Sequence, residues 1–341
     1  MSRFRDEIGE QPQVAARLLT HAKAFAAVGG RIRAAGPRGF MIAARGSSDH
    51  AALYAKYLFA TRNGALVALA APSLFTHYAR PPRLGGMCVI GISQSGASPD
   101  VIAVVEEGRR QGCLTIAITN DPASRLAAAA ELVLPLDAGP ERSVPASKTY
   151  TASVLALALI SQAVDPDPAF AAALARVPEA IAAALLLEDA LDGLVAPLLG
   201  PRAVVLGRGF NFSTAEEIAL KLTETSYVLA RAWSVADFEH GPVAVVEPGL
   251  PALIVEGGGP VTGDIESSAE RLAAMGCKVM RLLDGPPRRG ESTVALDSGL
   301  PEELTPLTLA VLGQLLAHRV AVARKIDPDR PRALNKVTRT W

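Results

Sequence analysis

The sequence predicts an α/β fold built from two tandem copies of one domain, each a parallel sheet covered by helices. Short β-rich runs alternate with longer alanine-rich helical stretches, which is typical of such sheets. Two sets of these strands recur at a nearly constant spacing along the chain. The chain has 341 residues, half of them hydrophobic, which is enough for about two domains of roughly 100 to 200 residues each.

Six apolar runs are the clearest strand candidates. Three of them precede residue 120, at 40–44, 87–92 and 114–119, and three follow residue 200, at 203–207, 251–256 and 278–283. Arg-Gly pairs at 45–46 and 208–209 lie 163 residues apart, and Gly-Cys pairs at 112–113 and 276–277 lie 164 apart. The matching order of strands and helices predicts a tandem duplication.

The domain boundaries follow from this repeat and from helix-breaking residues. A helix is predicted around residues 12–27, packed on the first copy, and the Asp-Pro-Asp-Pro stretch at 165–168 ends another helix. We therefore predict a helical N-terminal segment (1–30), a first domain (31–168), a helical linker (169–194), a second domain (195–330) and a C-terminal tail (331–341).

Charge and composition exclude several partners. Lysine plus arginine equals aspartate plus glutamate at 34 each, so no net field attracts nucleic acid or an anionic membrane. Cys88, Cys113 and Cys277 sit in or beside apolar runs, as buried thiols of a reducing compartment do. The N-terminus lacks the apolar core of a signal peptide, and no uninterrupted apolar run approaches 18 residues. We expect a soluble, cytoplasmic protein.

A serine-rich loop follows the second strand of copy one. Ser93, Gln94, Ser95 and Ser98 precede Pro99, which suits the first position of a helix whose N-cap is Ser98. Free amides at a helix N-terminus, with hydroxyl and amide donors, can hold a phosphate without any lysine or arginine. The alternative is a turn that merely caps the helix. Copy two has Glu-Gly-Gly-Gly-Pro at the equivalent 256–260, so copy one is the one specialised for an anion.

A second serine cluster, Ser47 and Ser48, follows the first strand after Gly46. Ligands of open parallel sheets collect beyond the carboxyl ends of the strands, so both clusters should face one crevice. The alternative for Ser48 is a simple N-cap of the helix that begins there.

Five motifs together resemble the sugar isomerase (SIS) domain family. They are GSS at 46–48, SQSGAS at 93–98, EIALKLTETSY at 217–227, EHGP at 239–242 and PRALNKVT at 331–338. More narrowly, the chain is similar to the isomerase half of glucosamine-6-phosphate synthase and to stand-alone SIS-type deaminases. The resemblance implies two αβα sandwiches of flavodoxin-like character, each with a five-stranded parallel sheet, and a homodimer with active sites shared near the interface.

The same resemblance assigns roles to residues. Ser48, Ser93, Gln94, Ser95 and Ser98 would contact the sugar phosphate, and Ser47 belongs to the same cluster. Glu224 would move a proton between C1 and C2 of the sugar, His240 would open the ring, and Lys336 would meet the open-chain carbonyl.

These assignments also have a chemical basis. A proton next to a carbonyl is moved by a carboxylate, and a lysine amine can form a Schiff base with a ketose carbonyl. Glu224 follows Lys221 by three residues, so the alternative is an ordinary salt bridge on a solvated helix. His240 could be a surface-loop histidine, and Lys336 a basic residue of a disordered end.

Other features separate the chain from the synthase. It starts with Met1-Ser2-Arg3 and leads directly into the isomerase region, so we expect no glutaminase domain and favour the ammonia-releasing direction. Ala97 replaces a glutamate of the family motif, Ser98 keeps only the hydroxyl of its threonine, and the tail reads LNKVTRTW instead of LAKSVTVE. These differences leave the substrate open.

The sequence thus predicts a deaminase that converts glucosamine 6-phosphate and water to fructose 6-phosphate and ammonia. Alternatives are a galactosamine-6-phosphate deaminase, a fructosamine-6-phosphate deglycase, another ketose/aldose isomerase, or a non-catalytic sugar-phosphate sensor. We expect no cofactor, because histidines and cysteines lack metal-ligand spacing and the serine loop does not match the dinucleotide fingerprint.

Overall fold

A computed structural model describes residues 2–286 and 292–336, arranged in two compact units. The sheet-one unit comprises Gln13–Glu141, Lys148–Ala175 and Asn335–Trp341, and the sheet-two unit comprises Met1–Pro12, Arg142–Ser147 and Arg176–Leu334. Helices α2 (Gln11–Thr20) and α9 (Pro168–Leu185) each contribute residues to both units.

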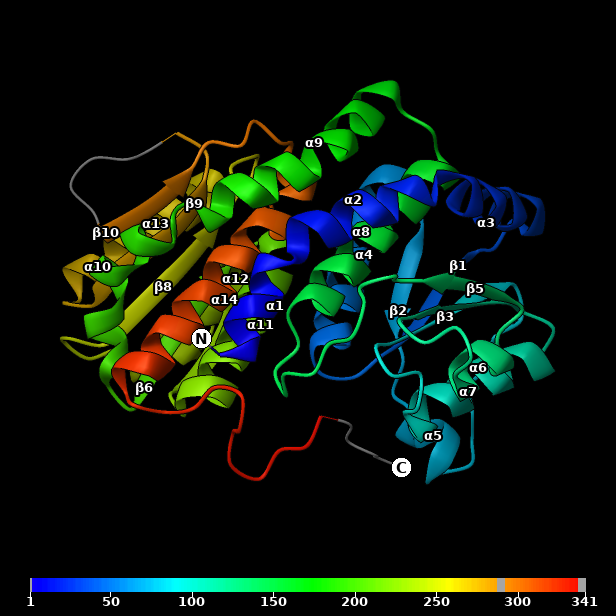
Figure 1. The fold of residues 1–341 in the computed structure, drawn as a ribbon, viewed down its shortest axis with the longest axis horizontal. Coiled ribbons are helices and arrows are strands. Elements are labelled where there is room, and N and C mark those ends of the chain that lie inside the picture. The colour runs from blue at the N-terminus through cyan, green and yellow to red at the C-terminus, as the bar shows by residue number, and fades with distance from the viewer. Residues whose placement is uncertain (1, 287–291, 337–341) are drawn as a thin grey trace. The chain divides into compact units, whose positions relative to one another are not determined.

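The sheet-one unit contains a five-stranded sheet in which all strands are parallel. Its order is β2-β1-β3-β4-β5, and the sheet is drawn in Figure 1. The strands are β1 (Gly39–Ala43), β2 (Leu66–Leu69), β3 (Met87–Ser93), β4 (Leu114–Thr119) and β5 (Leu132–Pro135).

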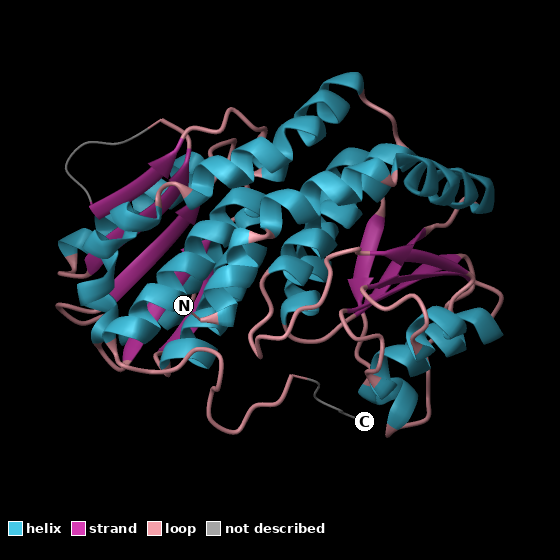
Figure 2. Cartoon of the chain, in the orientation of Figure 1, coloured by secondary structure: helices cyan, strands magenta, loops and turns pink. Residues whose placement is uncertain are grey.

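Helices cover both faces of this sheet (Figure 2). One layer contains α8 (Lys148–Val164), which packs against α3 (Ala22–Ala35) and α4 (Ser47–Asn63). The other contains α6 (Pro99–Arg110), which packs against α5 (Ser73–Thr76) and α7 (Arg125–Ala129). The predicted single helix at 12–27 is instead α2 and α3, which meet at His21.

The sheet-two unit repeats the same topology. Its order is β10-β9-β8-β6-β7. Read from the other end, as β7-β6-β8-β9-β10, it matches the order of the first sheet strand by strand. The strands are β6 (Arg202–Gly207), β7 (Leu229–Ser234), β8 (Pro251–Glu256), β9 (Lys278–Asp284) and β10 (Ser292–Leu296). Two parallel five-stranded sheets confirm the predicted fold class and the duplication.

The helices of the sheet-two unit form the equivalent layers. α14 (Pro306–Ala323) packs against α11 (Phe210–Ser226) and α1 (Arg3–Gly9), and α12 (Val235–Glu239) packs against α13 (Thr262–Ala274). Short helices complete the unit: η1 (Glu188–Leu191), α10 (Asp192–Val195), η2 (Ala196–Leu199), η3 (Pro242–Val245) and η4 (Glu302–Leu304).

The backbone at the start of the duplicated helices supports the repeat. Gly46 precedes α4 with φ 55° and ψ −133°, and Gly209 precedes α11 with φ 60° and ψ −134°. Residues other than glycine rarely adopt this conformation. The Arg-Gly pairs recognised in the sequence therefore mark the same strand-to-helix turn in both units.

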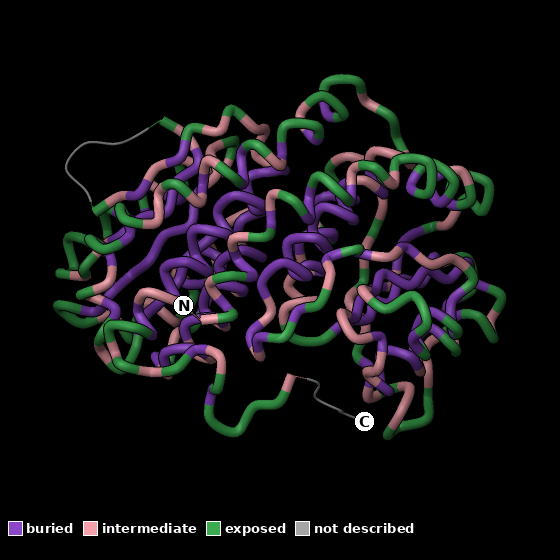
Figure 3. The backbone as a smooth tube through the Cα atoms, viewed as in Figure 1, coloured by how far each residue is buried: buried purple, intermediate pink, exposed green. Residues whose placement is uncertain are grey.

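Buried residues concentrate along the central strands and the helices beside them (Figure 3). By length and composition α9 and the segment Glu302–Ala323 could each span a membrane, but the latter is mostly buried, as a core helix is. Cys88 and Cys113 are buried free thiols, and burial raises the pKa of Cys88 to about 12. Cys277 is only partly buried, contrary to expectation.

Candidate functional site

The two serine clusters lie at the topological switch point of the first sheet. β1 lies between β2 and β3 in the sheet. The chain runs from β1 to β2 on one side of β1 and then crosses to β3 on its other side. A crevice forms beyond the carboxyl ends of strands where the order reverses in this way, and ligands of such sheets bind there. Ser47 and Ser48 follow β1, and the serine loop follows β3.

The hydroxyl groups of Ser93 and Ser95 accept hydrogen bonds within the serine loop. Ser93 Oγ accepts from Gly96 N at 3.2 Å, and Ser95 Oγ accepts from Ala97 N at 3.3 Å. A hydroxyl that accepts a hydrogen bond can still donate its own proton, as binding of an anion would require. These bonds also mean that Gly96 N and Ala97 N, which we expected to be free, already have partners within the loop.

Ser98 and Gln94 add two further donors. Ser98 is the N-cap residue of α6 and Pro99 its first residue, as predicted. The Ser98 side chain, however, makes no capping hydrogen bond, and its Oγ lies 3.4 Å from Ser93 Oγ. Within the described residues the Gln94 side-chain amide has no partner either, whereas its carbonyl accepts from Asn120 N at 3.1 Å. The Ser98 hydroxyl therefore does not cap α6, and the phosphate role of the loop stays a prediction.

Gly96 allows the loop to turn tightly against its neighbours. Its φ is +59°, and a Cβ at this position would overlap Oγ and Cβ of Ser124. Only glycine satisfies both constraints. Gly96 O also accepts from Leu126 N at 3.0 Å, so the loop is held against the segment that follows β4.

The second cluster begins α4. Gly46 is the N-cap residue, so Ser47 and Ser48 are the first and second helical residues and neither is the cap. Both are partly buried, and neither hydroxyl has a hydrogen-bond partner in the described part of the chain. Two more hydroxyl donors thus stand at a helix N-terminus, where the helix dipole favours an anion.

An ion pair that sequence reasoning missed joins the two loops. Arg45 directly precedes Gly46, and its Nε donates to Oδ2 of Asp100 at 2.6 Å. Asp100 is the second residue of α6, and its side chain is fully buried. The loop after β1 is therefore tied to the helix that follows the serine loop.

The equivalent crevice of the sheet-two unit is filled by side chains. A Cβ at Gly257 would overlap Thr305 Oγ1 and Asn211 Nδ2, and a Cβ at Gly259 would overlap the Glu302 carboxylate. These glycines are the counterparts of Ser93 and Ser95 at an offset of 164. Gly257 and Gly259 of copy two are thus required because other side chains occupy the space that serines hold in copy one.

The acidic residue at this place in copy two does not face the crevice. Glu256 is fully buried and accepts from Arg281 Nη1 at 2.9 Å, within a pair that is itself fully buried. Such a pair is stable only when both charges are hydrogen-bonded. Both features favour copy one over copy two as the place for the predicted anion site.

We predict that Glu302→Gln changes the pH dependence of stability. Partial burial, together with the nearby charge of Glu303, raises the pKa of Glu302 to about 7. A carboxyl whose folded pKa is raised loses stabilisation as pH rises from its unfolded value through 7. The variant should therefore unfold like the wild type at pH 5 and be more stable at pH 8. The gain should be on the order of 1 kcal/mol, since solvent screens this half-buried group.

Urea unfolding at the two pH values measures this difference. Glu106→Gln, which removes an exposed carboxylate of α6, is the matched control. Its stability relative to the wild type should be the same at both pH values. An equal effect of Glu302→Gln at pH 5 and pH 8 would show that Glu302 is an ordinary carboxylate.

Glu224 lies in the last turns of α11, in the sheet-two unit, and is part of a buried charge cluster. Its Oε2 accepts from Lys221 Nζ at 2.5 Å, and the same ammonium lies 3.5 Å from Oε1 of Glu217. The Lys221 and Glu217 side chains are 1% and 0% exposed, against 21% for Glu224. Glu224 is thus the member that solvent or a substrate can reach, and its helix face is not a solvated one.

His240 follows α12 in the sheet-two unit. It is exposed, and its imidazole has no hydrogen-bond partner among residues 2–286 and 292–336. Gly241 has φ +138°, and Pro242 begins η3, so the Gly-Pro pair fixes the turn after the histidine. An exposed imidazole can exchange protons, as ring opening requires.

Lys336 is held by a carboxylate that no sequence pattern singles out. Its Nζ donates to Oε2 of Glu141 at 2.7 Å, and both residues belong to the sheet-one unit. Glu141 is fully buried and also accepts from Thr149 N at 3.1 Å and Thr149 Oγ1 at 2.8 Å. Lys336 is therefore paired with a buried carboxylate. Residues 337–341 of the predicted tail lie outside the described residues.

An earlier part of the tail is anchored separately, in the sheet-two unit. Arg332 N donates to the Tyr227 hydroxyl at 2.9 Å, and the Arg332 guanidinium lies 3.9 Å from the centre of the Tyr227 ring. Tyr227 is the C-cap residue of α11, three residues after Glu224.

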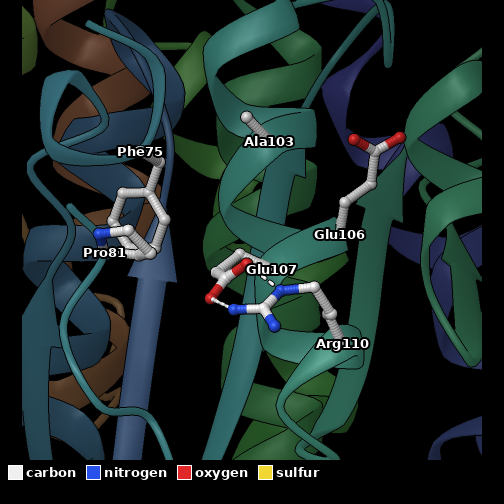
Figure 4. Close-up of a pocket in the computed structure, with 6 residues that line it drawn as sticks. All are labelled: Phe75, Pro81, Ala103, Glu106, Glu107 and Arg110. Carbon is white, nitrogen blue, oxygen red and sulfur yellow. Dashed lines mark hydrogen bonds and ion pairs between the residues drawn. The ribbon is translucent and has the colours of Figure 1, made fainter. Parts of the chain in front are cut away.

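Two surface pockets lie away from these residues. One, of about 260 Å³, is lined by Phe75 and Pro81 on one side and by Ala103, Glu106, Glu107 and Arg110 of α6 on the other (Figure 4). The Arg110 guanidinium binds Glu107 there and lowers its pKa. The second, of about 440 Å³, includes Arg208, Glu239 and Asp264 of the sheet-two unit. Neither is lined by a predicted site residue.

The structure thus places the predicted residues in two groups. Ser47, Ser48, Ser93, Gln94, Ser95 and Ser98 surround one switch point, and Lys336 belongs to the same unit. Glu224 and His240 belong to the other unit. The roles assigned to them stay predictions.

Comparison with known proteins agrees with this architecture. Residues 37–163 match the model of the SIS domain. A crystal structure from Silicibacter pomeroyi, of a protein provisionally named a phosphosugar isomerase, is 34% identical, with a TM-score of 0.88 over 96% of this chain and 100% of that chain. A glucosamine-6-phosphate deaminase from Thermotoga maritima shares the fold, with a TM-score of 0.79 over 99% of this chain and 100% of that one, at 21% identity.

A curated relative extends the comparison. The glutamine–fructose-6-phosphate aminotransferase (isomerizing) of Bradyrhizobium diazoefficiens is 32% identical over 97% of this chain and 57% of its own length. The chain therefore spans about half the length of the curated relatives that it matches. The predicted resemblance is confirmed: this chain belongs to the SIS domain family and is homologous to the isomerase half of the aminotransferase.

Proposed function

We propose that the protein is a phosphosugar isomerase of the SIS type that deaminates glucosamine 6-phosphate to fructose 6-phosphate and ammonia. The observation that carries this proposal is the pair of serine clusters at the β1/β3 switch point, in the copy whose counterpart has glycines in place of Ser93 and Ser95. Six hydroxyl and amide donors around helix N-termini suit a phosphate.

The chemistry requires a proton to move between neighbouring carbons. In the proposed reaction His240 opens the ring, and Glu224 takes the proton from C2 and returns it to C1. C2 then becomes an imine, which water hydrolyses to the ketone and ammonia. Lys336, held by Glu141, would interact with the open-chain carbonyl. The buried Lys221 ammonium keeps Glu224 oriented as the base.

Related substrates are the second candidates, because homology to the isomerase half of the aminotransferase is equally compatible with them. They are galactosamine 6-phosphate, a fructosamine 6-phosphate, and a ketose or aldose phosphate without nitrogen. A non-catalytic sensor would bind the phosphate and leave it unchanged. We further propose a cytoplasmic homodimer with shared active sites, with neither nucleic acid nor membrane as a partner.

Ammonia release from the purified protein tests the proposal. Glucosamine 6-phosphate and galactosamine 6-phosphate are supplied side by side, without added metal or nucleotide. Release from glucosamine 6-phosphate is the expected result. Release from galactosamine 6-phosphate alone would show that the substrate is the galactosamine epimer instead. Binding of both without release from either would contradict deamination and direct the assay to fructosamine phosphates and plain isomerisation.

A further inference from the structure

Two carboxylates lie beside the loops that are proposed to hold a phosphate. Asp49 is in the first turn of α4, next to Ser48, and Asp100 is in the first turn of α6, two residues after Ser98. Burial raises the pKa of Asp49, and the charges of His50 and Arg45 oppose this rise. A dianionic phosphate would be repelled by these carboxylates unless a cation offset them.

Arg45 is the cation in a position to do so. Its Nε is bound to Asp100 at 2.6 Å, while the side chain remains 47% exposed. A guanidinium has five N–H donors in a planar fork. The remaining four, on Nη1 and Nη2, have no hydrogen-bond partner among the described residues, so they are available to an anion.

The duplication supplies an internal comparison. Arg208 and Asp264 are the counterparts of Arg45 and Asp100, at offsets of 163 and 164, and they form an ion pair of 3.0 Å. In that pair the terminal Nη2 binds the aspartate, and Asp264 is 58% exposed. The Arg–Asp pair itself is thus common to both copies. In the copy with the serine loop, Arg45 instead binds the aspartate through Nε. Both of its terminal nitrogens are then without a partner among the described residues.

We infer that Arg45 is a direct ligand of the substrate phosphate, completing the serine site as a bidentate guanidinium donor anchored by Asp100. This inference rests on the proposed function and deepens it, since it makes the ligand a dianionic phosphate monoester. Bidentate, charge-assisted hydrogen bonds are the geometry in which arginine binds phosphate most effectively.

The double variant Arg45→Gln/Asp100→Asn tests the inference by removing both charges of the Arg45–Asp100 ion pair together. Calorimetric titration with inorganic phosphate and with glucosamine 6-phosphate should show binding weakened by about tenfold or more, the usual size of a charge-assisted contact. Arg208→Gln/Asp264→Asn removes the matched pair in copy two and should bind within about twofold of the wild type. The urea midpoint of each variant reports the structural effect separately.

Arg45→Lys is the second variant. It keeps a positive charge beside Asp100 but loses the planar fork, and we expect an intermediate loss of phosphate affinity with the fold retained.

Wild-type affinity in both the Arg45→Gln/Asp100→Asn variant and Arg45→Lys would overturn the inference while leaving the proposed function intact. Equal losses in the copy-one and copy-two double variants would also overturn it, because the pair would then act only through the fold. If the wild type itself bound no sugar phosphate, the proposed function would fail together with the inference.

Discussion

Glu224→Gln should reduce turnover by about two to four orders of magnitude, the usual contribution of a general base, while affinity for the sugar phosphate is retained. The amide preserves the shape of the side chain but cannot accept the C2 proton. It leaves the phosphate donors unchanged, because they belong to the other unit. Ammonia release measures the first effect, and calorimetric titration with glucosamine 6-phosphate measures the second.

Glu216→Gln is the matched control, since it removes a carboxylate from the same helix α11. It should leave turnover close to the wild type. Near-normal turnover of Glu224→Gln would show that another group moves the proton. Equal losses in both variants would point to a general effect on α11.

Gly96→Ala should abolish phosphate binding and destabilise the sheet-one unit by about 2 to 4 kcal/mol. An alanine at φ +59° is strained, and its methyl group would overlap Ser124; strain and overpacking each cost on the order of 1 to 3 kcal/mol. The loop must then move away from Ser124, which displaces the hydroxyl groups of Ser93 and Ser95. Urea unfolding and phosphate titration measure the two effects.

Gly112→Ala separates the two causes. Gly112 also has a positive φ, of +75°, but a Cβ there would meet nothing within 4 Å. We expect only the conformational penalty of about 1 kcal/mol and unchanged phosphate binding. If Gly96→Ala behaved like Gly112→Ala, the close approach to Ser124 would have no part in shaping the site.

The interior strands could be predicted from the sequence, but the edge strands could not. All six predicted runs became strands of the sheet interiors: β1, β3, β4, β6, β8 and β9. Such strands are covered on both faces and are therefore continuously apolar. The four missed strands, β2, β5, β7 and β10, are edges whose residues are partly exposed, so their short sequences resemble those of loops.

The position of the serine loop was predictable for a related reason. Its position depends only on local order, strand then loop then helix, and the topology brings the loop after β1 beside it. Glu141 was not predictable, because its partner Lys336 is 195 residues away in the sequence and only the fold brings them together.

Arg45 and Asp100 could have been found from the sequence. The offsets of 163 and 164 that revealed the duplication also align them with Arg208 and Asp264. A charged pair that recurs in both copies indicates a contact, even though the two residues are 55 apart.

The side chains that fill the second crevice carry no such signal. Glu302 and Thr305 belong to η4 and its C-cap, whereas Asn211 belongs to α11, and only the space at Gly257 and Gly259 shows why those positions lack side chains. The sequence showed that copy two had lost its serines, and the structure explains what replaced them.

Proton exchange with solvent tests most directly the claim that this protein moves a proton between C1 and C2. The purified protein is incubated in D₂O with fructose 6-phosphate and, separately, with glucosamine 6-phosphate, and the sugar is followed by proton NMR. We predict deuterium incorporation at C1 of the ketose or C2 of the aldose, and none with Glu224→Gln. Binding of either sugar phosphate without any exchange would contradict the account and identify the protein as a sensor.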